Sequence, residues 1–422
     1  MLDAVDVGSG DAAAKFSGSE NVIVDGLLGT GASGGPRGSI ARAIVSANAM
    51  RARGAVVVAL DLPSGVDASS GLVNDVSITA DLTITFGAMK RGHLVARGRC
   101  GTIVVVDIGL PPSASDREMP QLIEERWVAS LVPAIAADAH KGTRKKLAIV
   151  GGASGMAGAA ILAARAALRS GVGMVKLVVA PPSLPVIQEA EPHALAAEWG
   201  SSEAAVDEHI VNWADAVVIG PGLGRDDDSR SLLDRVLRRW RGPALLDADA
   251  ITLFEKRTPD LASLLDGRPA LLTPHPAEFA RLSGSSVDRI LEERFEAGGR
   301  VALELGAAVL LKGVPTVVSA PDGRRLVSAA GTPALATAGS GDVLSGIAGT
   351  LLAQLGDPFL AGAMAAWIHG RAAERVPLGA GDGVRGIVLE DVVAELRSVW
   401  TFDTRPMRYP VLAELMAFGG RL

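Results

Sequence analysis

Runs of apolar residues, separated by polar and glycine-rich turns, follow one another along most of the 422-residue chain. In its first part, apolar residues at helical spacing predict a helix over Ser39–Arg53, and short apolar runs predict strands. These strands are expected at Asn21–Leu28, Ala55–Leu60, Asp81–Phe86 and Thr102–Asp107. Buried strands that alternate with helices indicate a parallel α/β sheet.

A second alternating series follows residues 109–121, a stretch rich in proline, serine and charge that is typical of a linker. Helices are expected near 156–170, 228–240, 285–305, 340–355 and 358–376. Strands are expected at Lys146–Val150, Met174–Val179, Ala216–Ile219, Pro243–Leu246, Ala270–Leu272, Ala308–Leu311 and Thr316–Ser319. Because a chain of this length usually forms more than one domain, we predict domains at 1–118 and 122–402 and a tail at 403–422.

The composition is that of a globular protein, with 48% hydrophobic and 21% charged residues and a formal net charge of −6. This mild acidity gives no reason to expect nucleic acid or a membrane surface as a partner. The single cysteine, Cys100, excludes an intrachain disulfide framework and suits a reducing compartment. Neither a signal peptide nor a membrane-spanning run of about 20 apolar residues is recognised. We expect a cytoplasmic homo-oligomer that binds small molecules.

The segment Ala338–Gly346, AGSGDVLSG, is expected to open a helix. Gly339 and Gly341 would let the backbone approach a ligand closely, and the N–H groups and dipole of a helix start favour an anion. Asp342 would then act as a base beside an anion hole, which is the arrangement that phosphoryl transfer needs. The alternative is that Asp342 only caps the helix, and the two flanking glycines favour the catalytic interpretation.

Three more segments follow predicted strands, where ligand sites of α/β proteins lie. In Leu311–Thr316, LKGVPT, the lysine, the amides and the Thr316 hydroxyl would face nucleotide phosphates, unless the segment is an ordinary hairpin. His275 lies between two prolines in TPHPAE and is either a ligand contact or a structural histidine. Gly220–Gly224, GPGLG, is either a tight turn or a point of close approach to substrate. No P-loop sequence occurs in the chain.

In the first domain, Gly29–Gly34 (GTGASG) matches the GxGxxG pattern between a strand and a helix, which alone is a weak signal. Asp25 and Asp61 end adjacent strands, and Ser64 follows closely. Two carboxylates and a hydroxyl at neighbouring strand ends could hold a hard cation or could cap loops. Metal binding by histidine or cysteine is not expected, because HExxH and CxxC spacings do not occur.

Together these motifs resemble the bifunctional NAD(P)H-hydrate repair enzymes, which fuse an NAD(P)H-hydrate epimerase to an ADP-dependent NAD(P)H-hydrate dehydratase. The similarity is fullest over residues 122–400, through GPGLG, LDADAI, LTPHPAEFARL, LLKG and ATAGSGDVLSG. It implies a ribokinase-like C-terminal domain preceded by a partial Rossmann-like α/β domain. The partial domain resembles the second half of the epimerase in VDGLLGTGASG, ALDLPSGVDASSG, ADLTITFGAMKRGHL and VVVDIGLP. The epimerase family's earlier glycine- and asparagine-rich loop has no counterpart in the sequence.

The resemblance also implies roles for individual residues. The hydrated dinucleotide would contact Ala159, Gly222, His275 and Asp342. ADP would bind along Lys312, Gly313, Val314, Pro315, Thr316 and Gly341, and the anion hole would be Gly339, Ser340 and Gly341. In the first domain, substrate would contact Gly29, Thr30, Gly31, Ala32, Ser33, Gly34 and Asp61, and potassium would bind Asp25 and Ser64.

The implied activity is ADP-dependent dehydration of the S-form of hydrated NADH or NADPH to NAD(P)H, AMP and phosphate. Asp342 would accept the hydroxyl proton, the amides of Gly339–Asp342 would stabilise the phosphoryl charge, and Mg²⁺ would bridge the nucleotide oxygens. The first domain would convert the R-hydrate to the S-form. A small-molecule kinase of the same fold is one alternative. A non-catalytic nucleotide sensor is another, and it is disfavoured for the second domain by Asp342 and its glycines.

We expect this polypeptide to lack efficient epimerase activity. Epimerisation needs groups that converge from several strand ends, and Asp25, Asp61 and Ser64 supply only part of that set. The missing elements would also leave a sheet edge and an apolar surface uncovered. The measurement supplies pure R-hydrate and follows its conversion to the S-form above the spontaneous rate, with residues 122–402 as the control. Clear epimerisation by the full chain alone would contradict the expectation.

Overall fold

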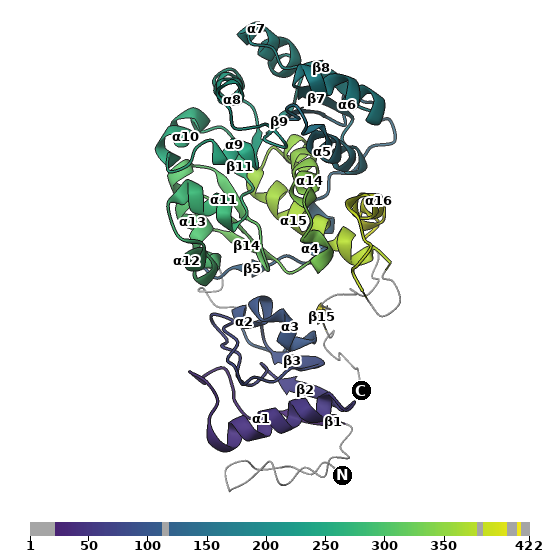
Figure 1. Cartoon of the computed structure of the whole chain (residues 1–422). Helices are drawn as coiled ribbons and strands as arrows, with labels where there is room; N and C mark the ends of the chain where they lie inside the picture. The colour runs from purple at the N-terminus through teal and green to yellow at the C-terminus, as the bar shows by residue number, and fades with distance from the viewer. Residues whose placement is uncertain (1–21, 112–117, 378–382, 403–411, 415–422) are drawn as a thin grey trace. The chain divides into compact units, whose positions relative to one another are not determined.

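The computed structural model describes residues 22–111, 118–377 and 383–402 and the backbone of 412–414 (Figure 1). The chain divides into two compact units. The first comprises Met1–Ser113 with Arg405–Leu422, and the second comprises Ala114–Thr404. Residues 112–117 of the proposed linker lie outside the described residues, as does the proposed tail apart from 412–414.

The first unit is built on a parallel sheet with the strand order β1-β2-β3-β4-β15. The strands are β1 (Val22–Asp25), β2 (Val56–Leu60), β3 (Leu82–Phe86), β4 (Thr102–Val106) and β15 (Leu412–Glu414). The helices are α1 (Gly38–Arg51), α2 (Arg91–Val95) and α3 (Arg97–Cys100). The strands expected from the apolar runs are therefore present, and a segment from the proposed tail adds a strand beside β4.

Within the described residues, α1 covers one face of this sheet. Ile44 and Met50 of α1 share a buried core with Val57 of β2. On the opposite face, Val22 and Val24 of β1 are 56% and 51% exposed, and β1 forms an edge of the sheet.

The second unit contains a ten-stranded sheet with the order β5-β14-β13-β12-β11-β10-β9-β6-β7-β8. The strands are β5 (Gln121–Leu122), β6 (Lys146–Val150), β7 (Met174–Val179), β8 (Leu195–Glu198), β9 (Ala216–Ile219), β10 (Ala244–Leu246), β11 (Ala270–Leu272), β12 (Ala308–Leu311), β13 (Thr316–Ser319) and β14 (Arg325–Ser328). Strands β6 to β12 run parallel, whereas β13 pairs antiparallel with both β12 and β14.

Helices cover both faces of this sheet and give an α/β/α sandwich (Figure 1). Leu147 and Ile149 of β6 share one core with α5, α14, α15 and α16, whereas Ala148 and Val150 share the other with α8, α10 and α13. The helices are α4 (Glu125–Leu131), α5 (Ala157–Arg169), α6 (Leu184–Ala190), α7 (Glu203–Val206), α8 (Asp227–Arg239), α9 (Asp249–Thr252), α10 (Thr258–Leu265), α11 (Pro276–Ser283), α12 (Val287–Glu292), α13 (Arg294–Leu305), α14 (Ser340–Leu355), α15 (Pro358–Arg375) and α16 (Leu389–Val399).

The helix expected over 285–305 is wrong as a single element. Glu293, with φ of −100° and ψ of 24°, ends α12 and precedes α13. Ile290 and Val301, one from each helix, reach the same core. The apolar pattern therefore continues across the break, which is why the pattern did not reveal it.

The close contact between α14 and α5 makes glycine necessary at position 346. A Cβ atom built on Gly346 would lie 2.1 Å from the Ala163 carbonyl oxygen. We expect Gly346→Ala to lower the free energy of unfolding by about 1–3 kcal/mol, because helix backbone must move apart. The control is Gly299→Ala in α13, where a Cβ meets nothing within 4 Å and where alanine is favoured by up to ~1 kcal/mol. Equal urea midpoints for the two variants would contradict this account.

Candidate active site

The start of α14 is the centre of the candidate site. Gly339 precedes the helix with a φ of 92°, and Ser340 is its first residue. The Ser340 amide donates to the Thr337 carbonyl at 3.2 Å. The next two amides, of Gly341 and Asp342, have no backbone acceptor within the part of the chain that the structure describes. Free amides at the start of a long helix favour an anion.

The expected anion hole of Gly339, Ser340 and Gly341 stays a prediction, and the structure shows that one of its amides already has a partner. Ser340 was expected to contribute to it, yet its amide is already used by Thr337. Its hydroxyl is the group that remains, and it lies 3.4 Å from Nε2 of the buried His369. Sequence reasoning missed His369, because its only signal was a histidine within an apolar helical pattern.

A lysine held by two carboxylates lies next to the free amides. Lys312, just after β12, donates from Nζ to Asp247 Oδ1 at 2.9 Å and lies 3.7 Å from Glu278 Oε2. Ser345, on α14, donates to Asp247 Oδ2 at 2.7 Å. A Cβ atom built on Gly341 would lie 3.2 Å from Lys312 Nζ. A phosphoryl group at the amides would therefore lie close to an ammonium group.

The charges around Asp342 suit it to proton transfer at neutral pH. Burial raises the pKa of Asp342 to about 7, the Asp247 carboxylate acts in the same direction, and Lys312 opposes them. Burial alone would lower the pKa of Lys312, but Asp247 and Glu278 outweigh it, so this pKa is raised and the lysine stays charged. α14 has no side-chain cap among the described residues, so the structure gives no support to Asp342 as a mere cap.

His275 has a clear structural role. It is the N-cap of α11, and its Nδ1 accepts hydrogen bonds from the amides of Ala277 and Glu278 at 3.1 and 3.4 Å. The Glu278 carboxylate in turn accepts from the His275 amide at 2.8 Å. Burial lowers the pKa of His275, and its side chain is 46% exposed. The structural interpretation is therefore supported, while the exposed part of the ring stays available to a ligand.

The glycines of GPGLG allow close approach within the protein itself. A Cβ atom on Gly220 would lie 1.8 Å from the Asp247 carbonyl oxygen, and one on Gly222 would lie 3.1 Å from Ala159 Cβ. The tight-turn interpretation thus has direct support. Gly222 and Ala159 also lie side by side, as a shared substrate contact would require.

The loop from Gly313 to Pro315 joins β12 to β13. Thr316 Oγ1 donates to the Gly313 carbonyl at 3.0 Å, so its proton is already used inside the loop. The Arg294 guanidinium, at the start of α13, donates to the Val314 carbonyl. Because β12 and β13 pair antiparallel, the segment is the loop of a hairpin, and Arg294 of the preceding helix is hydrogen-bonded to it. Its contact with nucleotide phosphates stays a prediction.

Sequence reasoning did not single out Arg294, Glu278, Ser345 or Asp247 as site residues. Asp247 had a signal in the acidic LDADAI motif after β10, and Ser345 had one in its position one turn beyond Gly341. Glu278 had a local signal as well, since it lies three residues after the N-cap His275 and completes a capping box. Arg294 has its partner at Val314, 20 positions away, which no local pattern reveals.

In the first unit, Asp25 and Ser64 come together. Ser64 donates to the two oxygens of Asp25, from Oγ at 2.7 Å and from its amide at 2.8 Å. Both residues are buried, and burial raises the pKa of Asp25. The two side chains satisfy each other, so their contact alone does not identify a bound cation.

Asp61 forms a separate polar cluster with residues that sequence reasoning missed. It has a positive φ of 65°, and its carboxylate accepts hydrogen bonds from Lys90 and Thr85. His93 Nε2 lies 2.6 Å from the Asp61 carbonyl oxygen. Burial would raise the pKa of Asp61, but the hydrogen bonds from Lys90, Thr85 and the Phe86 amide, together with the Lys90 charge, outweigh burial and hold this pKa below its usual value. In the nearby sequence Gly29–Gly34, Cβ atoms on Gly29 and Gly31 would meet nothing within 4 Å, which leaves space for a ligand.

Two kinds of feature are absent from the described residues. They contain no group of three or more histidine, cysteine, aspartate or glutamate side chains that could share a metal ion. The described helices also include none with the length and apolar character needed to cross a membrane.

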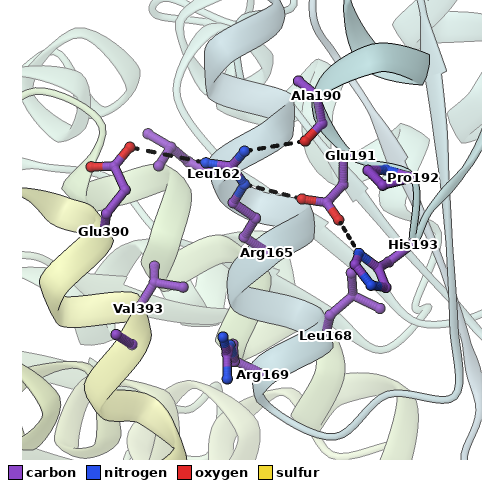
Figure 2. A pocket seen from close by; sticks show the side chains of 11 residues that line it. Leu162, Arg165, Leu168, Arg169, Ala190, Glu191, Pro192, His193, Glu390 and Val393 are labelled. Carbon is purple, nitrogen blue, oxygen red and sulfur yellow. Dashed lines mark hydrogen bonds and ion pairs between the residues drawn. The ribbon is translucent and has the colours of Figure 1, made fainter.

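A pocket of about 570 Å³ lies elsewhere in the second unit, between α5, the end of α6 and α16 (Figure 2). Figure 2 shows Arg165 between two acidic residues, with hydrogen bonds or ion pairs to Glu191 at 3.0 Å and Glu390 at 4.0 Å. None of the site residues inferred from the sequence lines this pocket. One lining residue, Leu162, also approaches the site, since its Cδ1 would lie 2.7 Å from a Cβ atom on Gly339.

Comparison with known proteins identifies the family. Residues 147–393 match the family model described as NAD(P)H-hydrate dehydratase, and residues 4–92 match the model described as YjeF-related protein N-terminus. The chain belongs to the NAD(P)H-hydrate dehydratase family. The dehydratase match contains all the dehydratase site residues inferred above, from Ala159 to Asp342. This membership favours dehydration over a small-molecule kinase.

Relatives and solved structures agree with this assignment. A bifunctional NAD(P)H-hydrate repair enzyme of Coxiella burnetii is 36% identical over 89% of this chain and 75% of its own length. The corresponding enzyme of Escherichia coli is 36% identical over 90% of this chain and 72% of its own.

The solved structures match the second unit. ADP/ATP-dependent NAD(P)H-hydrate dehydratase of Bacillus subtilis, co-crystallised with ATP/Mg²⁺, is 31% identical, with a TM-score of 0.60, over 67% of this chain and 99% of that one. A ribokinase-like superfamily protein of Enterococcus faecalis has a TM-score of 0.58 at 24% identity, over 67% of this chain and 95% of that one. The expected ribokinase-like α/β fold is confirmed.

The raised pKa of Asp342 predicts the pH dependence of turnover. A base must be deprotonated, so kcat/KM, which reports the free protein, should rise with pH through about 7. Asp247→Asn removes a neighbouring negative charge, so the midpoint of this rise should move to lower pH. Asp266→Asn, at an exposed aspartate paired with Arg241, is the matched control and should leave the midpoint unchanged. A midpoint that stays in place in Asp247→Asn would show that Asp342 does not titrate as described.

Proposed function

We propose that the second unit catalyses the ADP-dependent dehydration of S-form hydrated NADH or NADPH. The observation that carries this proposal is the placement of Asp342 in the first turn of α14, beside two free amides and the Lys312 ammonium. A base, amide donors for the transferring phosphoryl group and a cation are the parts that phosphoryl transfer requires. Membership of the dehydratase family and the ATP/Mg²⁺ complex of the B. subtilis relative support the choice of substrate and nucleotide.

The hydroxyl of the hydrate is a poor leaving group, and phosphorylation makes it a good one. Asp342 accepts the hydroxyl proton while the oxygen attacks the β-phosphorus of ADP, and the bond to the bridging oxygen breaks to release AMP. The ring nitrogen lone pair then expels inorganic phosphate, and the neighbouring carbon loses a proton to restore the double bond. One hydrate and one ADP thus give NAD(P)H, AMP and phosphate.

The amides of Gly341 and Asp342 would stabilise the charge of the transferring group, and Lys312 would bind the nucleotide phosphates. Mg²⁺, when bound, would neutralise charge on the nucleotide oxygens. The oxygens of Asp247 and Glu278, the carboxylates closest to Lys312, are the hard donors that suit this ion.

For the first unit we propose a site for the same hydrated dinucleotide beside Gly29–Gly34 and Asp61. The open space over Gly29 and Gly31 and the Lys90 ammonium on Asp61 support it. Potassium binding at Asp25 and Ser64 stays a prediction, since the two side chains already bond to each other. A cytoplasmic homo-oligomer stays a proposal as well, supported by the single buried cysteine for its compartment.

We expect Asp342→Asn to nearly abolish dehydration while ADP binding is largely retained. The change keeps the size of the side chain and removes its basicity, which typically contributes ~10²–10⁴ in rate. The measurements are recovery of NADH absorbance from the S-hydrate and ADP affinity by calorimetry. Asp266→Asn, at an exposed aspartate paired with Arg241, is the matched control. If Asp342→Asn keeps most of its turnover, the residue is not the base.

Lys312→Ala should weaken nucleotide binding more than binding of the hydrated dinucleotide. A charged hydrogen bond to phosphate contributes roughly 1.5–3 kcal/mol, whereas the dinucleotide is expected to contact other residues. The measurement is the equilibrium affinity of the variant for each ligand. Lys256→Ala, which lies outside the site, is the control for both affinities. Equal losses for the two ligands would count against the assignment.

A further inference from the structure

A histidine outside the residues assigned so far lies against the anion hole. His369 is on α15, a helix buried along most of its length, and its Nε2 lies 3.4 Å from Ser340 Oγ at the start of α14. The two residues are only 7% and 8% exposed. Buried polar atoms are costly unless they are hydrogen-bonded, so each depends on the other.

The contribution of Ser340 to a bound anion depends on its hydroxyl proton. The amide is used by Thr337, so only the hydroxyl is left. A hydroxyl has one proton and two lone pairs. If the Ser340 hydroxyl donates its hydrogen bond to His369, its oxygen presents only lone pairs to a phosphoryl group, and these lone pairs repel the phosphoryl oxygens. If His369 donates instead, the proton of Ser340 is free for the phosphoryl oxygen.

His369 can either donate a hydrogen bond to Ser340 or accept one from it, because its imidazole is neutral. Burial lowers the pKa of His369 to about 4, and the charge of Lys312 acts in the same direction. A neutral imidazole carries one proton, on either Nδ1 or Nε2, and its hydrogen-bond partners decide which. An anion next to Ser340 favours the tautomer in which Nε2 is the donor.

We propose that His369 is a positioning residue that carries its proton on Nε2 and donates it to Ser340 Oγ, so that the Ser340 hydroxyl becomes a donor to the transferred phosphoryl group. This inference rests on the proposed phosphoryl transfer. Ser340 Oγ then joins the amides of Gly341 and Asp342 around the phosphoryl oxygens. His369 itself touches neither substrate nor nucleotide and exchanges no proton during the reaction.

A double-mutant cycle tests the coupling. Ser340→Ala should lower kcat on the order of 10²-fold, the typical effect of removing one anion-hole donor, with the KM for ADP little changed. His369→Leu should lower kcat at least about tenfold in the parent protein and have no further effect in the Ser340→Ala background. His369→Gln should recover part of the loss, because its amide can donate to the same oxygen. His193→Gln, at a histidine whose side chain is 79% exposed, should behave like the parent.

A second measurement does not depend on activity or on the folding of a variant. Nitrogen-15 NMR of the imidazole rings in the parent protein, with the His369 signals assigned by their loss in His369→Gln, reports which nitrogen carries the proton. The proposal predicts a neutral ring with the proton on Nε2, both alone and with ADP and Mg²⁺.

The outcomes separate this inference from the proposed function. A proton on Nδ1, or a loss in His369→Leu that persists unchanged in the Ser340→Ala background, would overturn the positioning role while dehydration stands. Failure of the parent protein to recover NADH from the S-hydrate would instead contradict the proposed function. A proton on Nε2, together with a loss of kcat in His369→Leu that disappears in the Ser340→Ala background, would establish that His369 positions the Ser340 hydroxyl.

Discussion

The candidate site depends on the buried carboxylate of Asp247, which is 1% exposed. A buried charge is costly unless it is paired and hydrogen-bonded, and here Lys312 and Ser345 each bind one of its oxygens. These three residues come from the end of β10, the end of β12 and the first turns of α14. One electrostatic requirement therefore joins two strand ends to the helix whose first amides we propose to bind an anion, and it fixes an ammonium group beside them.

The same carboxylate distinguishes Asp342 from its acidic neighbours. Asp247 is neutralised by a lysine, whereas Asp342 is buried and faces that negative charge. A buried environment with a second carboxylate nearby is a common way to raise the pKa of a carboxylate and create a base that works near neutral pH. In this view the paired aspartate holds the site together and the unpaired one performs proton transfer.

The sequence revealed the parts of this site that are local. GSGD predicted a helix start with glycines and a carboxylate, and the alternation of apolar runs predicted the α/β sheet. Contacts between distant positions could not be read in this way: Ser345 and Lys312 are 98 and 65 positions from Asp247. The hydrogen bond from the Ser340 amide to Thr337 could not be predicted for a similar reason, because it depends on the fold of the preceding turn. The strand β13 was predicted but its antiparallel direction was not, because a short apolar strand carries no sign of its direction, and β14 was not predicted.

The most direct measurement incubates the protein with purified S-form hydrated NADH, ADP and Mg²⁺ and determines all the products together. If Asp342 and the amides of α14 promote phosphoryl transfer followed by loss of phosphate, NADH, AMP and inorganic phosphate should appear in equal amounts. Omitting ADP should prevent all three. Accumulation of a stable phosphorylated hydrate, or release of AMP and phosphate without NADH, would contradict the account.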